Sequence, residues 1–369
     1  MKKILCVLQL PPPVHGASLM NSYLTRSKLI NYNFNLEIIN LQFSKSIQHL
    51  EKFSFFKVYK AIRYSLLIIK KVIKSKPDLI YFTLSPKGFA FYRDAFYVLI
   101  FKIFNCKIIF HLHGKGIKEN IRGNILKKHI YIWVFKNTNV ICLSKILTTD
   151  IDTIFQTAPF IVPNGIPNKS EFKSGKKQVN KIPQILFLSN YIKTKGILVL
   201  IEALTILKEK GHVFLGRFVG GAADLTPEML ERMINTKNLK PFVEIVGPRY
   251  GEDKTKEFQN ADIFVFPTFY RNETFGLVNL EAMQFGLPVI STFEGGIPDI
   301  IINNETGFLV DKENPVMLAD RIEILLEDSD LRISMGEKGY NRYINNYTVE
   351  HFESNMLKIF KDILKENQI

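Results

Sequence analysis

The sequence lacks several features that would place it in familiar classes of protein. Its three cysteines, Cys6, Cys106 and Cys142, are widely spaced and form no CxxC pair, which argues against a disulfide framework and against a zinc site. No run of about twenty uncharged apolar residues occurs, so we expect no membrane-spanning helix. The chain begins with a short apolar run followed by three prolines, which predicts a buried first strand rather than a signal peptide. The cysteine usage fits a reducing cytosol, and we expect a cytoplasmic location.

Acidic residues are scarce in the first half of the chain. Residues 1–180 contain 28 Lys and Arg against 8 Asp and Glu, whereas residues 181–369 contain 21 against 27. A half that is this basic favours an anionic partner, which is a nucleic acid, an acidic substrate or a membrane surface. A genomic bias towards lysine explains part of the excess, but it does not explain the asymmetry.

Short apolar runs alternate with helical patterns along the whole chain. Runs that are apolar throughout are typical of strands buried on both faces of a parallel sheet, and helices between them predict a doubly wound α/β fold. The predicted strands are Ile4–Leu10, Leu79–Leu84, Lys107–His113, Asn139–Ser144 and Phe160–Gly165, then Gln184–Ser189, Leu215–Gly221, Val243–Gly247, Asp262–Pro267 and Pro288–Thr292.

Two such series are separated by a polar, Lys-rich stretch that is bounded by prolines. We therefore predict an N-terminal domain over residues 1–167, a linker over 168–183 and a C-terminal domain over 184–346. Residues 347–369 have the apolar spacing of a final amphipathic helix, which we expect to pack back on the N-terminal domain. In open α/β sheets, ligands bind at the carboxyl ends of strands, so a cleft between two facing sheets is the expected site.

The segment Asn272–Ile290 carries two glutamates, Glu273 and Glu281, within an apolar stretch. The apolar spacing predicts a helix that begins near Gly276. Free N–H groups around Phe275–Val278 would bind a phosphate, and a glycine lets that phosphate approach the backbone. Glu281 would then accept two hydrogen bonds from a ribose. The plainer alternative is that Glu273 stabilises the N-terminus of the helix electrostatically and that Glu281 is a solvated residue of the helix.

This stretch resembles the signature E-x7-E of the retaining glycosyltransferases of family four, which have the GT-B fold. The pattern E-G-F-G-L-x-x-x-E-A-M-A-x-G-x-P-V-V is matched from Glu273 onwards, with Thr274 in place of glycine. The next segment, Glu294–Asp311, resembles the family's G-G-x-x-E-x-I…G-x-L-V, with Asp299 where Glu is usual.

The resemblance implies an α/β, GT-B fold with two Rossmann-like doubly wound domains that face each other across a cleft. It also implies a donor nucleotide-sugar on the C-terminal domain, with Glu281 on the ribose and Glu273 near the sugar. The family uses front-side attack, in which the leaving phosphate takes the acceptor proton, so we expect no nucleophile and no cofactor. The D-x-D metal motif is absent, because the similar strings at Asp150–Asp152 and Asp328–Asp330 have helical contexts, and we expect no essential metal.

A second loop carries Lys195 between a strand and a helix, where an ammonium can neutralise a diphosphate. On its own, a solvated loop lysine would be the plainer reading. The family pattern G-R-L-x-x-x-K-G places both Arg and Lys on the diphosphate. Lys195 matches the lysine, but Asn190 stands at the usual arginine, and Lys193 or Arg249 are candidates to replace it.

A third loop follows a strand that ends in His111-x-His113, whose side chains point the same way. Such a pair can bind a metal or pack at a strand end. The family places a His-Gly here, facing the sugar and the acceptor, and His113-Gly114 matches it. The first loop contains Gly16, which resembles the family's P-x-x-G-G loop against the donor phosphates, and we treat the adjacent His15 as a neighbour without a catalytic role.

These matches give a full set of predicted site residues. The predicted catalytic residues are His113, Glu273 and Lys195, and the predicted donor-binding residues are Gly16, Asn190, Lys195, Arg249, Thr274, Phe275, Gly276, Leu277, Val278 and Glu281.

The segment Lys52–Lys76 interleaves aromatic and aliphatic residues with cations and contains no acid. A basic amphipathic helix is typical of a protein that docks on anionic lipids, with Lys and Arg stems extended towards the headgroups. An ordinary surface helix is the alternative. No aromatic and basic RNA motif and no helix-turn-helix spacing appear, so we expect no nucleic-acid partner.

Together, these observations predict a retaining glycosyltransferase. We expect transfer of a hexose or N-acetylhexosamine from a nucleotide-sugar, UDP-linked by family habit, to a membrane-anchored glycan in O-antigen or capsule synthesis. Such an enzyme would be peripheral on the inner face of the cytoplasmic membrane. The alternatives are a nucleotide-sugar epimerase or hydrolase of the same fold, and a non-catalytic nucleotide-sugar-binding protein.

Overall fold

The computed structural model describes residues 1–43, 55–170 and 180–365, and these form two compact units. One unit contains residues 1–165 together with 349–369, and the other contains residues 166–348. The predicted linker falls in the second unit, and its residues 171–179 lie outside the described residues. Within the described residues, every helix is too short or too polar to cross a bilayer.

The first unit is built on a parallel sheet of six strands in the order β2-β1-β3-β4-β5-β6. The strands are β1 Lys3–Leu8, β2 Asn35–Asn40, β3 Leu79–Phe82, β4 Ile108–Leu112, β5 Asn139–Cys142 and β6 Phe160–Ile161. Apart from edge strands β2 and β6 and the end residues Lys3 and Asn139, these residues are buried, as expected for strands covered by helices on both faces.

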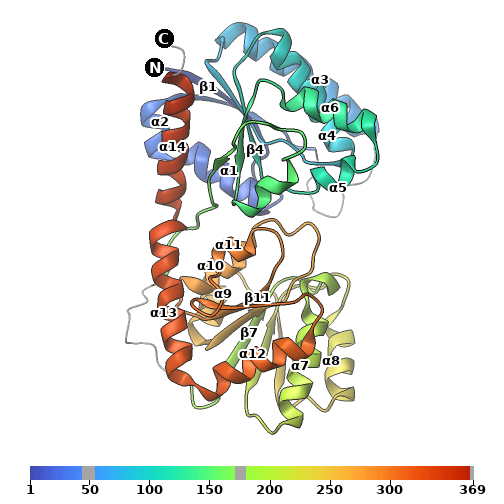
Figure 1. The fold of residues 1–369 in the computed structure, drawn as a ribbon, viewed down its shortest axis with the longest axis vertical. Helices are drawn as coiled ribbons and strands as arrows, with labels where there is room; N and C mark the ends of the chain where they lie inside the picture. The colour runs from blue at the N-terminus through green and yellow to red at the C-terminus, as the bar shows by residue number, and fades with distance from the viewer. Residues whose placement is uncertain (44–54, 171–179, 366–369) are drawn as a thin grey trace. The chain divides into compact units, whose positions relative to one another are not determined.

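Helices cover both faces of this sheet (Figure 1). On one face, α3, α4 and α6 build a core with the strands, and on the other face α1, α2 and α14 do so. The bounds are α1 Gly16–Arg26, α2 Lys28–Asn33, α3 Phe55–Ser75, α4 Gly88–Ile103, α5 Ile117–Ile121, α6 Ile125–Phe135, η2 Ile146–Asp150 and α14 Val349–Lys365.

Helix α14 belongs to the first unit although it ends the described chain. Its apolar residues Phe352, Met356, Ile359 and Phe360 are buried against α1, α2 and the sheet. The ring of Phe360 meets Phe34 and Tyr81 edge to face, with centroids 5.8 Å apart in both pairs.

The second unit also has a parallel sheet of six strands, in the order β12-β11-β10-β7-β8-β9. The strands are β7 Gln184–Leu188, β8 Leu215–Val219, β9 Val243–Gly247, β10 Ile263–Phe266, β11 Val289–Thr292 and β12 Gly307–Val310. The helices are η3 Lys193–Lys195, α7 Ile197–Glu209, α8 Pro227–Thr236, α9 Gly251–Asn260, α10 Leu277–Met283, α11 Ile297–Ile300, α12 Pro315–Glu327 and α13 Ser329–Asn346.

All ten predicted strands are present, and the predicted α/β class with two doubly wound sheets is confirmed. Two edge strands, β2 and β12, were not predicted. Strand β2 is NLEIIN, which is only partly buried, and β12 is a run of four buried residues flanked by polar residues in the sequence. The predicted basic helix is α3, and residues 52–54 lie outside the described residues.

Candidate functional site

The order of the second sheet creates a switch point between β7 and β10. The chain runs outwards from β7 through β8 to β9 and then returns to β10, from which it runs the other way through β11 to β12. Because the strands are parallel, the loops after β7 and β10 leave the same edge of the sheet on either side of this point. A switch point of this kind is where open α/β sheets bind ligands.

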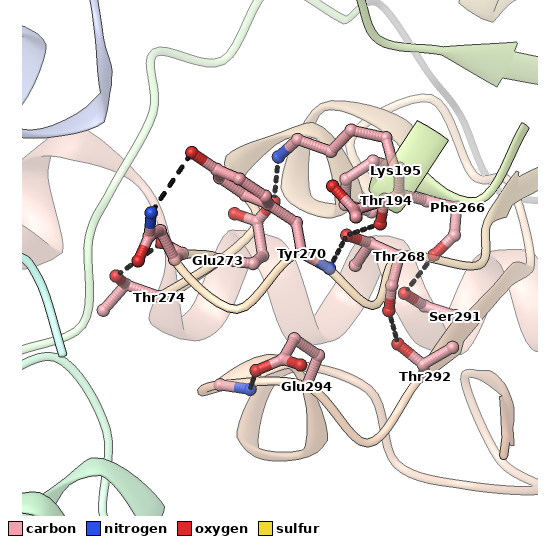
Figure 2. Close-up of polar contacts among 12 residues, drawn as sticks. Thr194, Lys195, Phe266, Thr268, Tyr270, Glu273, Thr274, Ser291, Thr292 and Glu294 are labelled. Atoms are coloured by element: carbon pink, nitrogen blue, oxygen red, sulfur yellow. Dashed lines mark hydrogen bonds and ion pairs between the residues drawn. The ribbon is translucent and has the colours of Figure 1, made fainter. Parts of the chain in front are cut away.

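Lys195 and Glu273 meet at this switch point. Lys195 comes from the loop after β7 and Glu273 from the loop after β10, and the Lys195 ammonium forms an ion pair with Glu273 Oε2 (Figure 2). The two side chains are only 16% and 13% exposed. Lys195 Nζ also lies 4.6 Å from the ring centroid of Tyr270 and 5.4 Å from that of Phe266. The pair is therefore held by rings and largely removed from solvent.

The backbones of the two loops touch directly. The N–H group of Phe269 donates to the carbonyl of Thr194 at 2.8 Å. Gly196 has φ +88°, and a Cβ at this position would lie 2.1 Å from the carbonyl oxygen of Pro267. Only glycine allows this contact, so the glycine after Lys195 fixes the distance between the loops.

Hydroxyl groups attach the next strand to the same loops (Figure 2). Ser291 Oγ donates to the carbonyl of Phe266 at 2.7 Å, and Thr292 Oγ1 donates to the carbonyl of Thr268. Gly295 has φ +56°, and a Cβ there would lie 2.4 Å from the carbonyl oxygen of Glu273. The glycine pair after β11 thus packs against the backbone that carries Glu273.

Helix α10 begins beside Glu273, as the apolar spacing predicts. Its N-cap is Gly276, with φ +72° and no side-chain cap. Of the predicted donor-binding residues around it, Thr274 and Phe275 are buried, and Phe275 packs edge to face on Tyr347 with centroids 6.3 Å apart. Leu277 and Val278 are half-buried in the first turn.

Asn279 is a buried polar residue in the same turn. Neither its Oδ1 nor its Nδ2 has a hydrogen-bond partner among the described residues. A Cβ on Gly276 would approach Asn279 Nδ2 to 2.8 Å. A buried amide without partners costs roughly 1–3 kcal/mol, so the start of α10 keeps unused hydrogen-bonding capacity.

The carboxylate of Glu281 forms an ion pair with a lysine. Both oxygens of its carboxylate accept from Lys254 Nζ of α9, at 2.7 and 2.8 Å, and both side chains are about seven-tenths buried. A carboxylate has about four lone-pair sites, so two remain for a sugar diol. Lys254 was missed by sequence reasoning, since it lies far from Glu281 along the chain.

The remaining predicted donor residues lie on neighbouring loops. Asn190 follows β7 and is exposed. Arg249 follows β9, is 41% exposed, and holds its Nε 3.8 Å from Glu257 Oε1. Glu257 is bound more tightly by Arg217, at 2.8 and 3.0 Å. Lys193 lies in η3, and its side chain is exposed.

In the first unit, Gly16 opens α1, and the adjacent His15 caps this helix. The N–H group of Ser18 donates to His15 Nδ1 at 3.4 Å, and the N–H group of His15 donates to Ser18 Oγ at 3.0 Å. This reciprocal cap is a structural role for His15, as expected of a neighbour of the glycine.

His113 follows β4, and its ring lies beside that of His111, tilted by 36° with centroids 4.0 Å apart, so the two side chains point the same way as predicted. His111 Nδ1 shares a hydrogen bond of 2.7 Å with the hydroxyl of Tyr81. Neither nitrogen of His113 has a partner among the described residues. Burial, and to a lesser extent His15, lowers the pKa of His113 to about 3, so the ring is neutral near pH 7.

Among the described residues, one group of side chains has the composition of a metal site. Ligand atoms of His212, Glu323 and Glu327 lie within 4.8 Å of one another. Glu323 is already paired with Lys210 Nζ at 2.5 Å and His212 Nε2 at 2.7 Å. The carboxylate of Glu323 is therefore already neutralised by the ammonium group of Lys210.

Two rings and one cation at the site were not found from the sequence. Tyr270 and Phe266 lie against Lys195, and Lys254 holds Glu281. Tyr270 could have been found, because it lies three residues before Glu273 in the polar loop. Nothing in the sequence around Lys254 indicates a role at the site, because it is one of several charged residues on helix α9.

Comparison with known proteins places the second unit in a family. Residues 168–342 match the sequence model of the family described as glycosyl transferases group 1. The uncharacterized glycosyltransferase MJ1178 of Methanocaldococcus jannaschii is 25% identical over 328 residues, which are 86% of this chain and 84% of that protein. The capsular polysaccharide biosynthesis glycosyltransferase CapM of Staphylococcus aureus is 27% identical over 252 residues, which are 64% of this chain and 65% of CapM.

Solved structures share the fold over nearly the whole chain. The glycosyltransferase from Rickettsia africae has a TM-score of 0.78 at 21% identity and covers 99% of both chains. Anabaena Alr3699/HepE, solved in complex with UDP, has a TM-score of 0.74 at 17% identity and covers 98% of this chain and 100% of that one. These likenesses confirm the predicted GT-B fold.

Proposed function

The chain contains a glycosyl transferases group 1 domain and is a glycosyltransferase, and we propose that it transfers a hexose or N-acetylhexosamine from a UDP-sugar to a hydroxyl of a membrane-anchored glycan. Three similarities support this proposal. The Anabaena structure was solved with UDP-glucose, CapM acts in capsular polysaccharide biosynthesis, and the similar WaaB is a lipopolysaccharide outer core galactosyltransferase. The proposed process is the synthesis of a surface polysaccharide.

The observation that carries the proposal is the Lys195–Glu273 ion pair at the switch point of the second sheet. A buried ion pair costs desolvation free energy that its own attraction barely offsets, so it is a poor device for stability alone. A pair placed where doubly wound sheets bind ligands is better explained by a charged ligand. Lys195 would turn to a donor diphosphate, and Glu273 would keep the ammonium in place until the donor arrives.

The neighbouring groups fit a nucleotide diphosphate. Gly276 leaves the first N–H groups of α10 open to a phosphate oxygen, and the buried amide of Asn279 lies directly behind that turn. Glu281 would accept two hydrogen bonds from the ribose while Lys254 holds the carboxylate from the other side. Phosphates, ribose and base would thus extend from Lys195 along α10.

The proposed reaction retains the anomeric configuration. The bond between the anomeric carbon and the leaving phosphate oxygen breaks, and the acceptor oxygen forms a bond to the same face of that carbon. The acceptor proton passes to the leaving phosphate, so no protein base is needed. Lys195 would stabilise the negative charge that develops on this phosphate. His113 is neutral, and its two nitrogens have no hydrogen-bond partner in the part of the chain that the structure describes, so it is proposed to hydrogen-bond the sugar or the acceptor.

The acceptor and its location follow from charge. Residues 1–180 carry a large excess of cations, which fits an anionic lipid carrier and the anionic membrane in which it is anchored. We therefore propose that the enzyme meets its acceptor at the inner face of the cytoplasmic membrane.

The experiment is a transfer assay with a panel of labelled nucleotide-sugars and a lipid-linked acceptor extract. The proposal predicts label in the lipid fraction and release of UDP only when donor and acceptor are both present. Conversion of the donor without acceptor would identify an epimerase or hydrolase instead. Binding of UDP-sugars without consumption, measured as thermal stabilisation, would identify a binding protein.

A further inference from the structure

Helix α4 presents a continuous apolar stripe to solvent. Phe89, Tyr92, Phe96, Leu99 and Ile103 recur at spacings of three and four residues, and all are exposed, Phe96 by 52% and Ile103 by 68%. Such spacing places them on one side of the helix. The opposite side of the same helix is buried in the core with Phe91, Val98 and other residues.

The helices on both sides of α4 extend this stripe. Helix α3 and helix α6 both contact α4 on the same face of the sheet (Figure 1). Exposed apolar residues on α3 include Ile62, Leu66 and Ile73, and on α6 they include Leu126 and Trp133. We call this surface of α3, α4 and α6 the apolar face. Scattered exposed apolar residues are normal, but such residues on two helices that both contact the α4 stripe favour an interaction site.

Positive charge accompanies the apolar face. The three helices contain many Lys and Arg but a single acid, Asp94, which is buried and paired with Arg93. Lys70 and Lys74 are exposed between the apolar residues of α3. On α6, Trp133 lies under Lys102, whose Nζ is 4.8 Å from the ring centroid. A tryptophan and a lysine in contact are typical of the depth of lipid headgroups.

We propose that the apolar face is a membrane-docking surface that inserts the stripe of α4 into the interfacial region of an anionic bilayer. Lys70 and Lys74 then lie among lipid phosphates, and the apolar side chains lie against the upper acyl chains. The sequence indicated α3 alone; the structure adds α4 and α6, which supply the apolar contact that a basic helix by itself lacks. The inference rests on the proposed function only for the membrane-anchored acceptor.

Charge decides between a bilayer and a second copy of this chain. An interface between two copies would bring the same lysines together, and the three helices offer no exposed acid to neutralise them. An anionic bilayer supplies the missing negative charge and an apolar layer together.

The experiment is flotation with two kinds of vesicle, one of pure phosphatidylcholine and one of an equal mixture with phosphatidylglycerol. We expect the full chain to float with the anionic vesicles and much less with the neutral ones. A double variant, Phe96→Ser with Ile103→Ser, should lower partitioning about tenfold or more, because it removes two exposed apolar side chains that the bilayer would bury. Tyr32→Ser, which changes an 86% exposed residue on α2, is the matched control and should float like the wild type.

A second double variant tests the electrostatic contribution to vesicle binding. Lys70→Glu with Lys74→Glu should abolish the preference for anionic vesicles, whereas Lys28→Glu on α2 should keep it. Equal flotation of the Phe96→Ser and Ile103→Ser double variant and the control would overturn the proposal. A wild-type dimer that this double variant dissociates, with no flotation, would overturn it in favour of a second copy.

UDP binding is measured on the same samples. The variants of the apolar face should bind UDP like the wild type, since these residues lie in the first unit. Flotation without UDP binding would leave the docking surface in place and refute the proposed donor, so the two failures are distinguishable.

Discussion

The two units share an architecture and differ in how they handle charge. Each is a parallel sheet of six strands between helices. In the first unit, cations stand on an apolar surface with few acids, and the histidines near His113 are buried and neutral. In the second unit, cations are held by carboxylates, as in Lys195–Glu273 and Lys254–Glu281. Charge in the first unit is available to a distant anionic surface, and charge in the second is placed for one ligand.

The largest expected effect is at the buried ion pair. Lys195→Met should lower turnover about 100- to 1,000-fold, because it removes the charge that stabilises the leaving diphosphate. Lys240→Met, at an exposed position before β9 in the same unit, is the control and should stay within about threefold of the wild type. Steady-state assays with the donor found in the panel measure both. Equal activity in the two variants would mean that the second unit does not use its paired cation for the donor.

The loop contact next to this pair predicts a difference between two glycines. Gly196 and Gly211 have nearly the same φ, +88° and +87°, but a Cβ at Gly211 meets nothing within 4 Å. Gly211→Ala should therefore cost about 1 kcal/mol of unfolding free energy through backbone strain alone. Gly196→Ala adds a clash with Pro267 and should cost at least about 3 kcal/mol. Urea unfolding measures both, and equal costs would show that the loops are not in contact.

Glu281 and Lys254 should act as one unit on the nucleotide. Glu281→Ala should weaken UDP binding about tenfold, as expected for the loss of hydrogen bonds to a charged group. Lys254→Ala should weaken it less, because the carboxylate remains but is free to turn. In calorimetric titrations, the double variant should bind no worse than Glu281→Ala. Additive losses would mean that Lys254 acts on the nucleotide independently.

The last prediction concerns the histidines of the first unit. The unfolded chain protonates His113 near its usual pKa of 6.5, but burial holds the folded pKa at about 3. The contribution of His113 to the free energy of unfolding is therefore fully present above about pH 6.5. It is lost as the pH drops from 6.5 towards 3, by about 1.4 kcal/mol per pH unit within that window. His113→Asn should make the unfolding free energy less dependent on pH between roughly 7 and 5.

Exposed His129→Asn is the control for this slope, and it should leave the pH dependence as in the wild type. If both variants keep the wild-type slope, the His113 ring titrates normally in the folded chain. His113→Ala should in addition lower turnover while leaving UDP affinity unchanged, since its proposed contact is with the sugar or the acceptor.

Sequence reasoning was most successful where the signal is local. The apolar runs predicted ten strands, because buried parallel strands are apolar along their whole length. The spacing after Glu273 predicted a helix that begins at Gly276, and α10 does begin there. Its end at Met283 was less visible, since the residues that follow, Gln284–Leu287, are buried like those of the helix.

What failed depends on contacts between distant segments. Nothing near Lys254 indicates that it reaches Glu281, and nothing near Tyr81 indicates its bond to His111. The exposed stripe of α4 reads in the sequence as core, because its apolar residues continue those on the buried side. Only the packing of α4 on α3, α6 and the sheet shows which side is left open.

The most direct test of the donor site compares UDP with uridine by titration calorimetry in wild type, Lys195→Met and Lys240→Met. Lys195 is proposed to contact only the diphosphate. The preference for UDP over uridine should therefore collapse in Lys195→Met and persist in Lys240→Met, with uridine binding alike in all three. The same preference in all three proteins would contradict the account, because the paired lysine at the switch point would then have no part in holding the phosphates.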